Sequence, residues 1–248
     1  MKNNISSKSV FFSTNTLTRI SLLIALNIIL SRFLGVMLPI AYFPTVKISF
    51  SHIPIFISGI LYGPFMGFIC GFISDYLGSF IGNSGGGGLL GFRLLFSLSS
   101  GLTGMISGLI FKVTKNRDRN FRKMNTIFIV FVSICLCIAF YAKALLVSRN
   151  IFFVFLLFII TLISVFLPAV AKKSKLVKNS LPLFEKIYFI INVSRVITSI
   201  FINTYLLSIL FGKSIVVFLP ARIITNFIMI PLLAIGTTVI IHALNIKK

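Results

Sequence analysis

Four basic side chains lie inside long apolar segments of this 248-residue chain: Arg32, Lys47, Arg93 and Arg222. A charge near the bilayer centre costs about 2.5–3.5 kcal/mol on insertion scales, so such residues usually face a partner or a polar cavity. An arginine side chain can hold a carboxylate through two parallel hydrogen bonds. The chemistry that these residues indicate is therefore the binding of an anion.

The segments around these residues predict an integral membrane protein. Hydrophobic residues make up 57% of the chain and charged residues only 11%, whereas a soluble domain carries roughly 25% charged residues. A span of about 20 apolar residues crosses the hydrocarbon core as a helix. We expect an all-α protein with about eight spans, near 17–38, 45–62, 65–82, 89–111, 125–145, 151–171, 187–211 and 215–242.

The distribution of Lys and Arg predicts the orientation of these spans. With a cytoplasmic N-terminus, the inside segments hold fifteen basic residues, mainly at 112–123 and 172–186. The outside loops hold only Arg149 and Lys213. Basic residues are enriched in cytoplasmic loops, so both termini should lie in the cytoplasm. The basic loops then need only contact membrane lipids, and we expect no nucleic-acid partner.

This orientation places the four basic residues of the apolar segments in the outer half of the membrane. Asp75, Asn203 and Thr204 should lie in the same layer or just below it. One acid cannot neutralise four cations, so the surplus charge predicts an outward-facing pocket for an anionic ligand. Two alternatives remain open: some of these side chains reach the outer headgroups, or Arg222 pairs with Asp75. Arg195 lies deeper and could reach cytoplasmic phosphates.

Glycine and other small residues predict where helices turn and approach closely. Gly63-Pro64 separates the second and third spans, which favours a hairpin of two helices. Small residues four apart, as in Gly63/Gly67, Gly104/Gly108 and Ser21/Ala25, allow close helix packing. The run Asn83 to Gly88 is either a flexible linker or a source of backbone N–H groups for an anion.

Catalytic and metal-binding patterns are missing from the sequence. It has no Walker A motif, no HExxH, and no Ser/His/Asp or Cys/His arrangement. The three cysteines fall in apolar segments without metal-ligand spacing and are interpreted as buried apolar residues. We therefore expect neither an enzyme nor a resident metal or cofactor.

An ordered series of motifs resembles one family of vitamin transporters. The motifs are "LSRFLG", "VKISFSHIPIFISGILYGPFMGFICGFISDYLGSFI", "FSLSSGLTGMISGLIFK" and "FINTYLLSILFGKSIVVFLPARIITNFIMIPL". Together they are similar to the folate-family substrate-binding (S) component of energy-coupling-factor (ECF) transporters. The resemblance covers roughly 17–112 and 187–242, and it depends on the order of the motifs more than on any single one.

The resemblance implies a six-helix bundle in a bacterial cell membrane that captures a vitamin from outside. It implies that a membrane scaffold (T) protein and two ABC-type ATPases complete the importer. The positions carried over as pocket or pocket-supporting residues are Arg32, Lys47, Ser49, Phe50, Asp75, Asn203, Thr204 and Arg222. Ser21 and Ala25 stand where the family contacts the scaffold.

Two departures from the family pattern affect this interpretation. The usual aromatic-Pro-Gly-Phe-Thr run is replaced by "GFRLLFSLSS", which brings Arg93 to the outer wall of the expected pocket. The sequence therefore indicates folate itself less strongly than an anionic vitamin in general. Two extra spans at 125–171 are inserted, either as a lipid-facing appendage or as a scaffold contact. The expected divisions are a cytoplasmic segment 1–16, helices one to four in 17–112, basic loops and hairpin in 113–186, and helices five and six in 187–248.

Three functions remain open from the sequence. The first is uptake of folate or a related anionic vitamin, and the second is uptake of a different vitamin or precursor by the same architecture. The third is a membrane enzyme that acts on lipids. Such enzymes usually need clustered acidic or histidine side chains, and this chain has three acids in total.

Overall fold

Contacts divide the chain into two units in the computed structural model. Unit 1 comprises Met1–Val36 and Ser49–Lys115, and unit 2 comprises Met37–Ile48 and Asn116–Lys248. The structure describes residues 14–33, 35–40, 43–81, 90–114, 120–144, 181–212 and 214–243. The predicted span 151–171 and the glycine run 83–88 lie outside these ranges.

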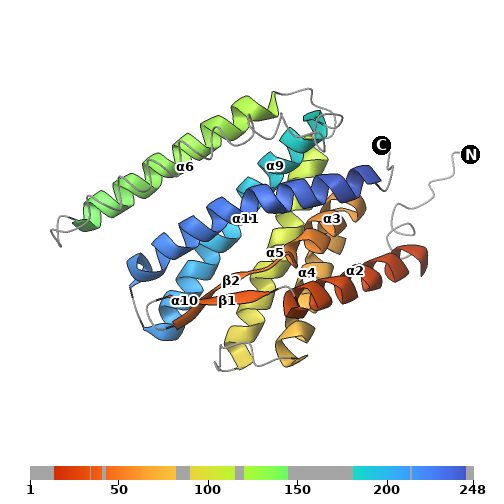
Figure 1. Ribbon diagram of the computed structural model, residues 1–248, viewed down its shortest axis with the longest axis horizontal. Helices are drawn as coiled ribbons and strands as arrows, with labels where there is room; N and C mark the ends of the chain where they lie inside the picture. Colours follow the sequence, from red (N-terminus) through yellow and green to blue (C-terminus); the bar gives the residue numbers. More distant parts are fainter. Residues whose placement is uncertain are drawn as a thin grey trace, which may run out of the picture. The chain divides into compact units, whose positions relative to one another are not determined.

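The described part of unit 1 consists of four helices. They are α2 (Thr14–Phe33), α3 (His52–Tyr62), α4 (Pro64–Ile81) and α5 (Leu90–Thr114). α3, α4 and α5 pack against one another, and α2 contacts α3 and α4 (Figure 1). The predicted hairpin is confirmed, because α3 ends at Gly63 and α4 begins at Pro64. Gly63 has φ of +93°, a conformation that glycine adopts without the strain of a side chain.

Glycines bring α3, α4 and α5 into backbone contact. A methyl group added at Gly104 would clash with the carbonyl oxygen of Gly67 on α4. One added at Gly108 would lie 2.7 Å from the carbonyl oxygen of Gly59 on α3. The small-residue prediction is confirmed for Gly67, Gly104 and Gly108, whereas Gly63 has open space around it and acts in the turn instead.

Unit 2 contains a two-stranded sheet and a set of longer helices. The strands are β1 (Val36–Ile40) and β2 (Phe43–Ile48). The helices are α6 (Phe121–Ala144), α9 (Leu181–Arg195), the π-helix η1 (Val196–Ile202), α10 (Asn203–Phe211) and α11 (Ile215–Ala243). α9, η1 and α10 form one continuous rod, and α11 packs along it in the opposite direction (Figure 1).

The two strands correct the purely helical expectation for the ends of the first two spans. The sequence predicted helices over 17–38 and 45–62, but α2 ends at Phe33 and α3 begins at His52. The intervening segment contains Pro39 and Pro44, which lack a backbone N–H and restrain the preceding residue to an extended conformation. It is also rich in β-branched residues, which favour strands.

Five helical stretches among the described residues are long and apolar enough to cross a membrane. They are Thr14–Phe33, Pro64–Ile81, Arg93–Thr114, Leu181–Phe211 and Phe218–Ala243. The apolar helix His52–Tyr62 is shorter than these. The protein is thus a multi-pass membrane protein, and the figure of eight spans remains a prediction.

The first helix of the inserted hairpin, α6, is joined to α9 by specific contacts. The buried Asn192 amide donates a hydrogen bond of 2.8 Å to the Asn125 side chain on α6. The Lys186 ammonium lies 5.8 Å from the centroid of the Phe121 ring. Phe128 packs with Val196 and Ile223, so α6 also covers the π-helix and part of α11. α6 is therefore an integral part of unit 2.

Candidate functional site

The predicted site residues divide between the two units. Arg32, Ser49, Phe50, Asp75 and Arg93 belong to unit 1, and Lys47, Asn203, Thr204 and Arg222 belong to unit 2. Each group is described within its own unit. Lys47 lies in strand β2, and its side chain is outside the described part of the structure.

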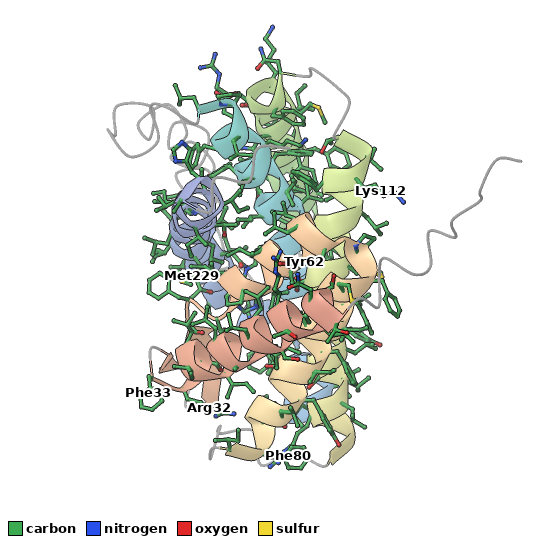
Figure 2. The ribbon with its side chains drawn as sticks, turned by 90° about the vertical axis from the view of Figure 1, so that its right-hand side faces the viewer. Arg32, Phe33, Tyr62, Phe80, Lys112 and Met229 are labelled. Atoms are coloured by element: carbon green, nitrogen blue, oxygen red, sulfur yellow. The ribbon has the colours of Figure 1, made fainter. Side chains whose placement is uncertain are left out.

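Arg32 lies in the last turn of α2, and its side chain extends to α4. A methyl group added at Gly78 would lie 3.7 Å from Nη2 of Arg32, so the guanidinium covers this glycine. Asp75 precedes Gly78 by three residues and shares its face of α4. Figure 2 shows Arg32 near the end of unit 1 that carries Phe80, whereas Lys112 lies toward the other end. Arg32 and Lys112 thus lie toward opposite ends of unit 1.

Ser49 and Phe50 form the turn that starts α3. The buried Ser49 hydroxyl donates a hydrogen bond of 2.7 Å to the Ser51 hydroxyl and accepts one of 3.0 Å from the Ser51 backbone N–H. The Phe50 carbonyl accepts a hydrogen bond from the Ile53 N–H. Asn27 of α2 donates to the Ser51 carbonyl. These bonds fix the turn against α2, five residues before Arg32.

Arg93 lies in the first turn of α5 and is half-buried. Its carbonyl accepts a hydrogen bond of 2.9 Å from the buried Ser97 hydroxyl. Arg93 and Lys112 stand near opposite ends of this helix. The sequence predicted that Arg93 lies in the outer half of the membrane, and this depth remains a prediction.

Asn203, Thr204 and Arg222 lie at similar distances along their helices from the turn that connects α10 and α11. Asn203 precedes the end of α10 by eight residues and Arg222 follows the start of α11 by seven. At 1.5 Å per residue, both lie about 10–12 Å from that turn. The buried Thr204 hydroxyl donates to the Ser199 carbonyl over 3.2 Å. Asn203 and Arg222 therefore occupy one layer of unit 2.

A chain of hydrogen bonds continues from this layer into the unit. The Arg195 Nε donates to the Asn226 side-chain oxygen over 3.0 Å. The Asn226 amide donates to the Ser199 hydroxyl over 3.0 Å and to the Arg222 carbonyl over 2.9 Å. We refer to Arg195, Ser199, Asn203, Arg222 and Asn226 as the π-turn cluster.

Three members of the cluster, Arg195, Ser199 and Asn226, are buried, the other two are half-buried, and the cluster carries two positive charges. Arg195 is only 8% exposed, and the Arg195 and Arg222 guanidinium charges repel each other. The interpretation of Arg195 as a side chain that reaches cytoplasmic phosphates is therefore wrong, because its side chain is held inside the unit by Asn226. Arg222 Nε and Asn203 Oδ1 are buried without a hydrogen-bond partner among the described residues.

The π-helix is the local feature that builds this cluster. Its backbone N–H groups bond to carbonyls five residues back, as the Asn203 N–H does to the Thr198 carbonyl. A π-turn shifts the helix face and leaves backbone groups for side-chain bonding, and such turns are frequent at functional sites. The β-branched residues and serine of "VITSIFI" have only modest α-helix propensity.

Sequence reasoning missed Ser199 and Asn226 and gave Arg195 a different role. A signal for Asn226 was available, because an asparagine four residues after Arg222 on one helix lies on the same face as Arg222.

The expected scaffold-contact pair is open on the surface of the described structure. Ser21 and Ala25 are both exposed on α2, and the Ser21 hydroxyl bonds back to the Leu17 carbonyl over 3.0 Å.

Comparison with known proteins gives the family. No curated protein and no solved structure matches the chain. The family model of the ECF transporter substrate-specific component matches residues 15–241, which is most of the chain. The expected S-component resemblance is thus confirmed at the level of the family, and the chain belongs to the family of substrate-specific components of ECF transporters.

Proposed function

We propose that this S component captures folate or a related anionic vitamin at the outer face of a bacterial cell membrane. As a member of its family it is the substrate-specific subunit of an ECF importer, which works with a T scaffold and ATPases and takes a vitamin-type substrate. Family members of this kind are transport subunits and not enzymes. The anionic substrate and the cytoplasmic position of both termini are parts of the proposal.

The observation that carries the proposal is a cationic layer with unused hydrogen-bonding capacity. Arg222 Nε and Asn203 Oδ1 are buried without a partner in the described structure, and Arg195 of the same unit is a buried arginine. Buried polar groups are nearly always hydrogen-bonded, so unpaired ones indicate a missing partner. A carboxylate is the natural partner of a guanidinium.

The residues of unit 1 support the same ligand class. Arg32 covers Gly78 at the end of α4, in the layer opposite Lys112. Phe50 and the phenylalanines of the neighbouring helices supply aromatic surface for a ring system such as the head group of folate. The proposed ligand-binding set is Arg32, Lys47, Ser49, Phe50, Asp75, Arg93, Asn203, Thr204 and Arg222.

A binding measurement tests the substrate. Tritiated folate is dialysed against the purified protein in detergent, and Arg222→Gln is compared with Arg122→Gln, which removes an exposed arginine at the start of α6. A hydrogen bond to a charged group contributes about 1.5–3 kcal/mol, so Arg222→Gln should weaken binding by roughly 10- to 100-fold. Folate binding that is equal in both variants contradicts a role for Arg222 in this site.

An uptake measurement tests the coupling to partners. Deletion of the ATPases should abolish uptake into cells and leave binding to the purified S component intact, because the chain has no nucleotide-binding motif of its own. Uptake that survives the deletion would exclude the coupled mechanism. The alternative of a different vitamin, raised by Arg93, is tested by the same dialysis with unlabelled competitors.

A further inference from the structure

The π-helix η1 adopts a register that its own sequence does not explain. π-turns are rare, and an apolar helical segment ordinarily takes the α register. The segment "VITSIFI" contains no Pro or Gly that would interrupt an α-helix. Yet the Asn203 N–H bonds to the Thr198 carbonyl, five residues back, whereas an α-helix would direct it to the Ser199 carbonyl, four residues back. Contacts from outside the segment must therefore select the π register.

Two polar side chains from outside η1 bond to Ser199. The Thr204 hydroxyl of α10 donates over 3.2 Å to the Ser199 carbonyl, which is the acceptor that the π register releases. This bond reaches five residues back, whereas a threonine in an α-helix reaches three or four. The Asn226 amide of α11 donates over 3.0 Å to the Ser199 hydroxyl. Both bonds are made at the residue whose carbonyl changes partner between the two registers.

The Asn226 side chain is held in this orientation by bonds on its other sides. Its oxygen accepts from Arg195 Nε over 3.0 Å, so the amide nitrogen is the group that faces Ser199. The same nitrogen donates to the Arg222 carbonyl over 2.9 Å. Arg195 immediately precedes η1, and Ser199 follows it by four residues. Asn226 thus ties α11 to two points about one turn apart on the α9–η1–α10 rod.

We propose that Ser199, Thr204 and Asn226 form a register clamp that holds η1 as a π-helix. The register sets the face on which α10 presents its first turn, because loss of one π-turn rotates every later residue by about 100°. Asn203 and Thr204 lie in that turn and belong to the proposed ligand-binding set. Ser199 and Asn226 are therefore positioning residues for the ligand site. This last step rests on the proposed function and deepens it, whereas the clamp itself does not depend on the ligand.

The exposed stripe of the rod reports the register. It consists of Phe201, Tyr205 and Ile209, whose side chains are 52–58% exposed, whereas Ser208 is half-buried and Leu206 is buried. In an α register, each residue of α10 takes the angular position of the residue that now follows it. Ser208 then moves to the exposed position of Ile209, and Tyr205 moves to the buried position of Leu206. The order of exposure of residues 205 and 208 is thus reversed.

The test measures this order with nitroxide labels at Tyr205→Cys or Ser208→Cys in the full-length protein, with the three native cysteines replaced by serine. The protein is reconstituted in phosphatidylcholine vesicles, and collisions with O2 are measured by electron paramagnetic resonance. O2 concentrates in lipid, so a lipid-facing label collides more often. The parent should show more collisions at 205 than at 208. Ser199→Ala with Thr204→Val removes both bonds and should reverse this order.

Three further variants make the result specific to the clamp. Asn226→Ala should give the same reversal, and it decides by the same criterion if the double variant does not fold. Ser199→Thr keeps the hydroxyl and should keep the parent order. Asn125→Ala loses an equivalent buried bond, which joins α6 to α9 and not to η1, and should also keep it. An unchanged order in the clamp variants, or a reversed order in the parent or in Asn125→Ala, overturns the clamp.

Folate dialysis tests the link between the register and the ligand site. Ser199→Ala should bind folate roughly 10-fold more weakly than Ser199→Thr, because the misplaced first turn of α10 loses about one hydrogen bond to the ligand. Equal folate binding by the two variants overturns the positioning role of Ser199. A parent protein that does not bind folate contradicts the proposed function, and the label order, which is measured without ligand, still decides the clamp.

Discussion

Replacement of Gly104 by alanine should strongly destabilise unit 1. The added methyl group would clash with the carbonyl oxygen of Gly67 and would lie 3.0 Å from Cγ2 of Ile55. The first obstacle is backbone, which cannot move without separating α4 from α5. Overpacking typically costs about 1–3 kcal/mol, and a backbone obstacle favours the upper end of that range. For a chain of this size, 3 kcal/mol lowers the unfolding midpoint by roughly 6–12 °C.

A thiol-reactive fluorophore reports this loss directly. Cys70 lies in α4 and is fully buried, whereas Cys135 is exposed on α6. In a background with Cys135 and Cys137 replaced by serine, Cys70 is the only thiol in the chain. The dye then reacts as unit 1 unfolds during heating.

Gly91→Ala is the matched control in the same helix. Nothing lies within 4 Å of a methyl group added at Gly91, and alanine is favoured over glycine in a helix by about 0.5–1 kcal/mol. The control should therefore unfold at or slightly above the midpoint of the parent protein. Equal midpoints for Gly104→Ala and Gly91→Ala would refute the close approach of α4 and α5.

Three further predictions concern the turn, α6 and the ligand. Gly63→Ala should cost about 1–3 kcal/mol, because φ of +93° with an extended ψ is almost restricted to glycine, and the same thermal assay measures it. Asn125→Ala should lower the free energy of unfolding by about 1–3 kcal/mol, because it leaves the buried Asn192 amide unpaired. The double variant Asn125→Leu with Asn192→Leu should recover part of this loss of stability. A double variant as unstable as the sum of its two single variants argues against the contact. Arg32→Ala should weaken ligand binding by roughly 10- to 100-fold without preventing membrane insertion, and unchanged binding in dialysis would assign Arg32 a structural or interfacial role.

The sequence predicted the helical elements well where a long apolar run or a strong turn signal defined them. The α3–α4 hairpin follows from Gly63-Pro64, and the close approach of α4 and α5 follows from glycines four apart. The strands β1 and β2 were not predicted, because hydropathy does not distinguish a short apolar strand from the end of a helix. The residues that distinguish the two strands from helix ends are Pro39 and Pro44, because proline disfavours a helix at the residue before it.

The candidate site could be predicted only as a layer and not as a set of contacts. Depth along each span placed Asn203 and Arg222 together because distance from a turn depends on residue count alone. The role of Asn226 depends on the π-helix, which shifts the register between the α9–α10 rod and α11. Such a shift arises from tertiary packing, and periodicity calculated from sequence assumes regular helices.

The identity of the small molecule that copurifies with this S component tests the central claim most directly. The protein is purified from cells in mild detergent, denatured, and its extract is analysed by mass spectrometry beside that of Arg222→Gln. An anionic substrate held by Arg222 predicts a carboxylate-bearing compound in the wild-type extract, and its loss from the variant. A neutral or cationic compound retained equally by both proteins would contradict the account.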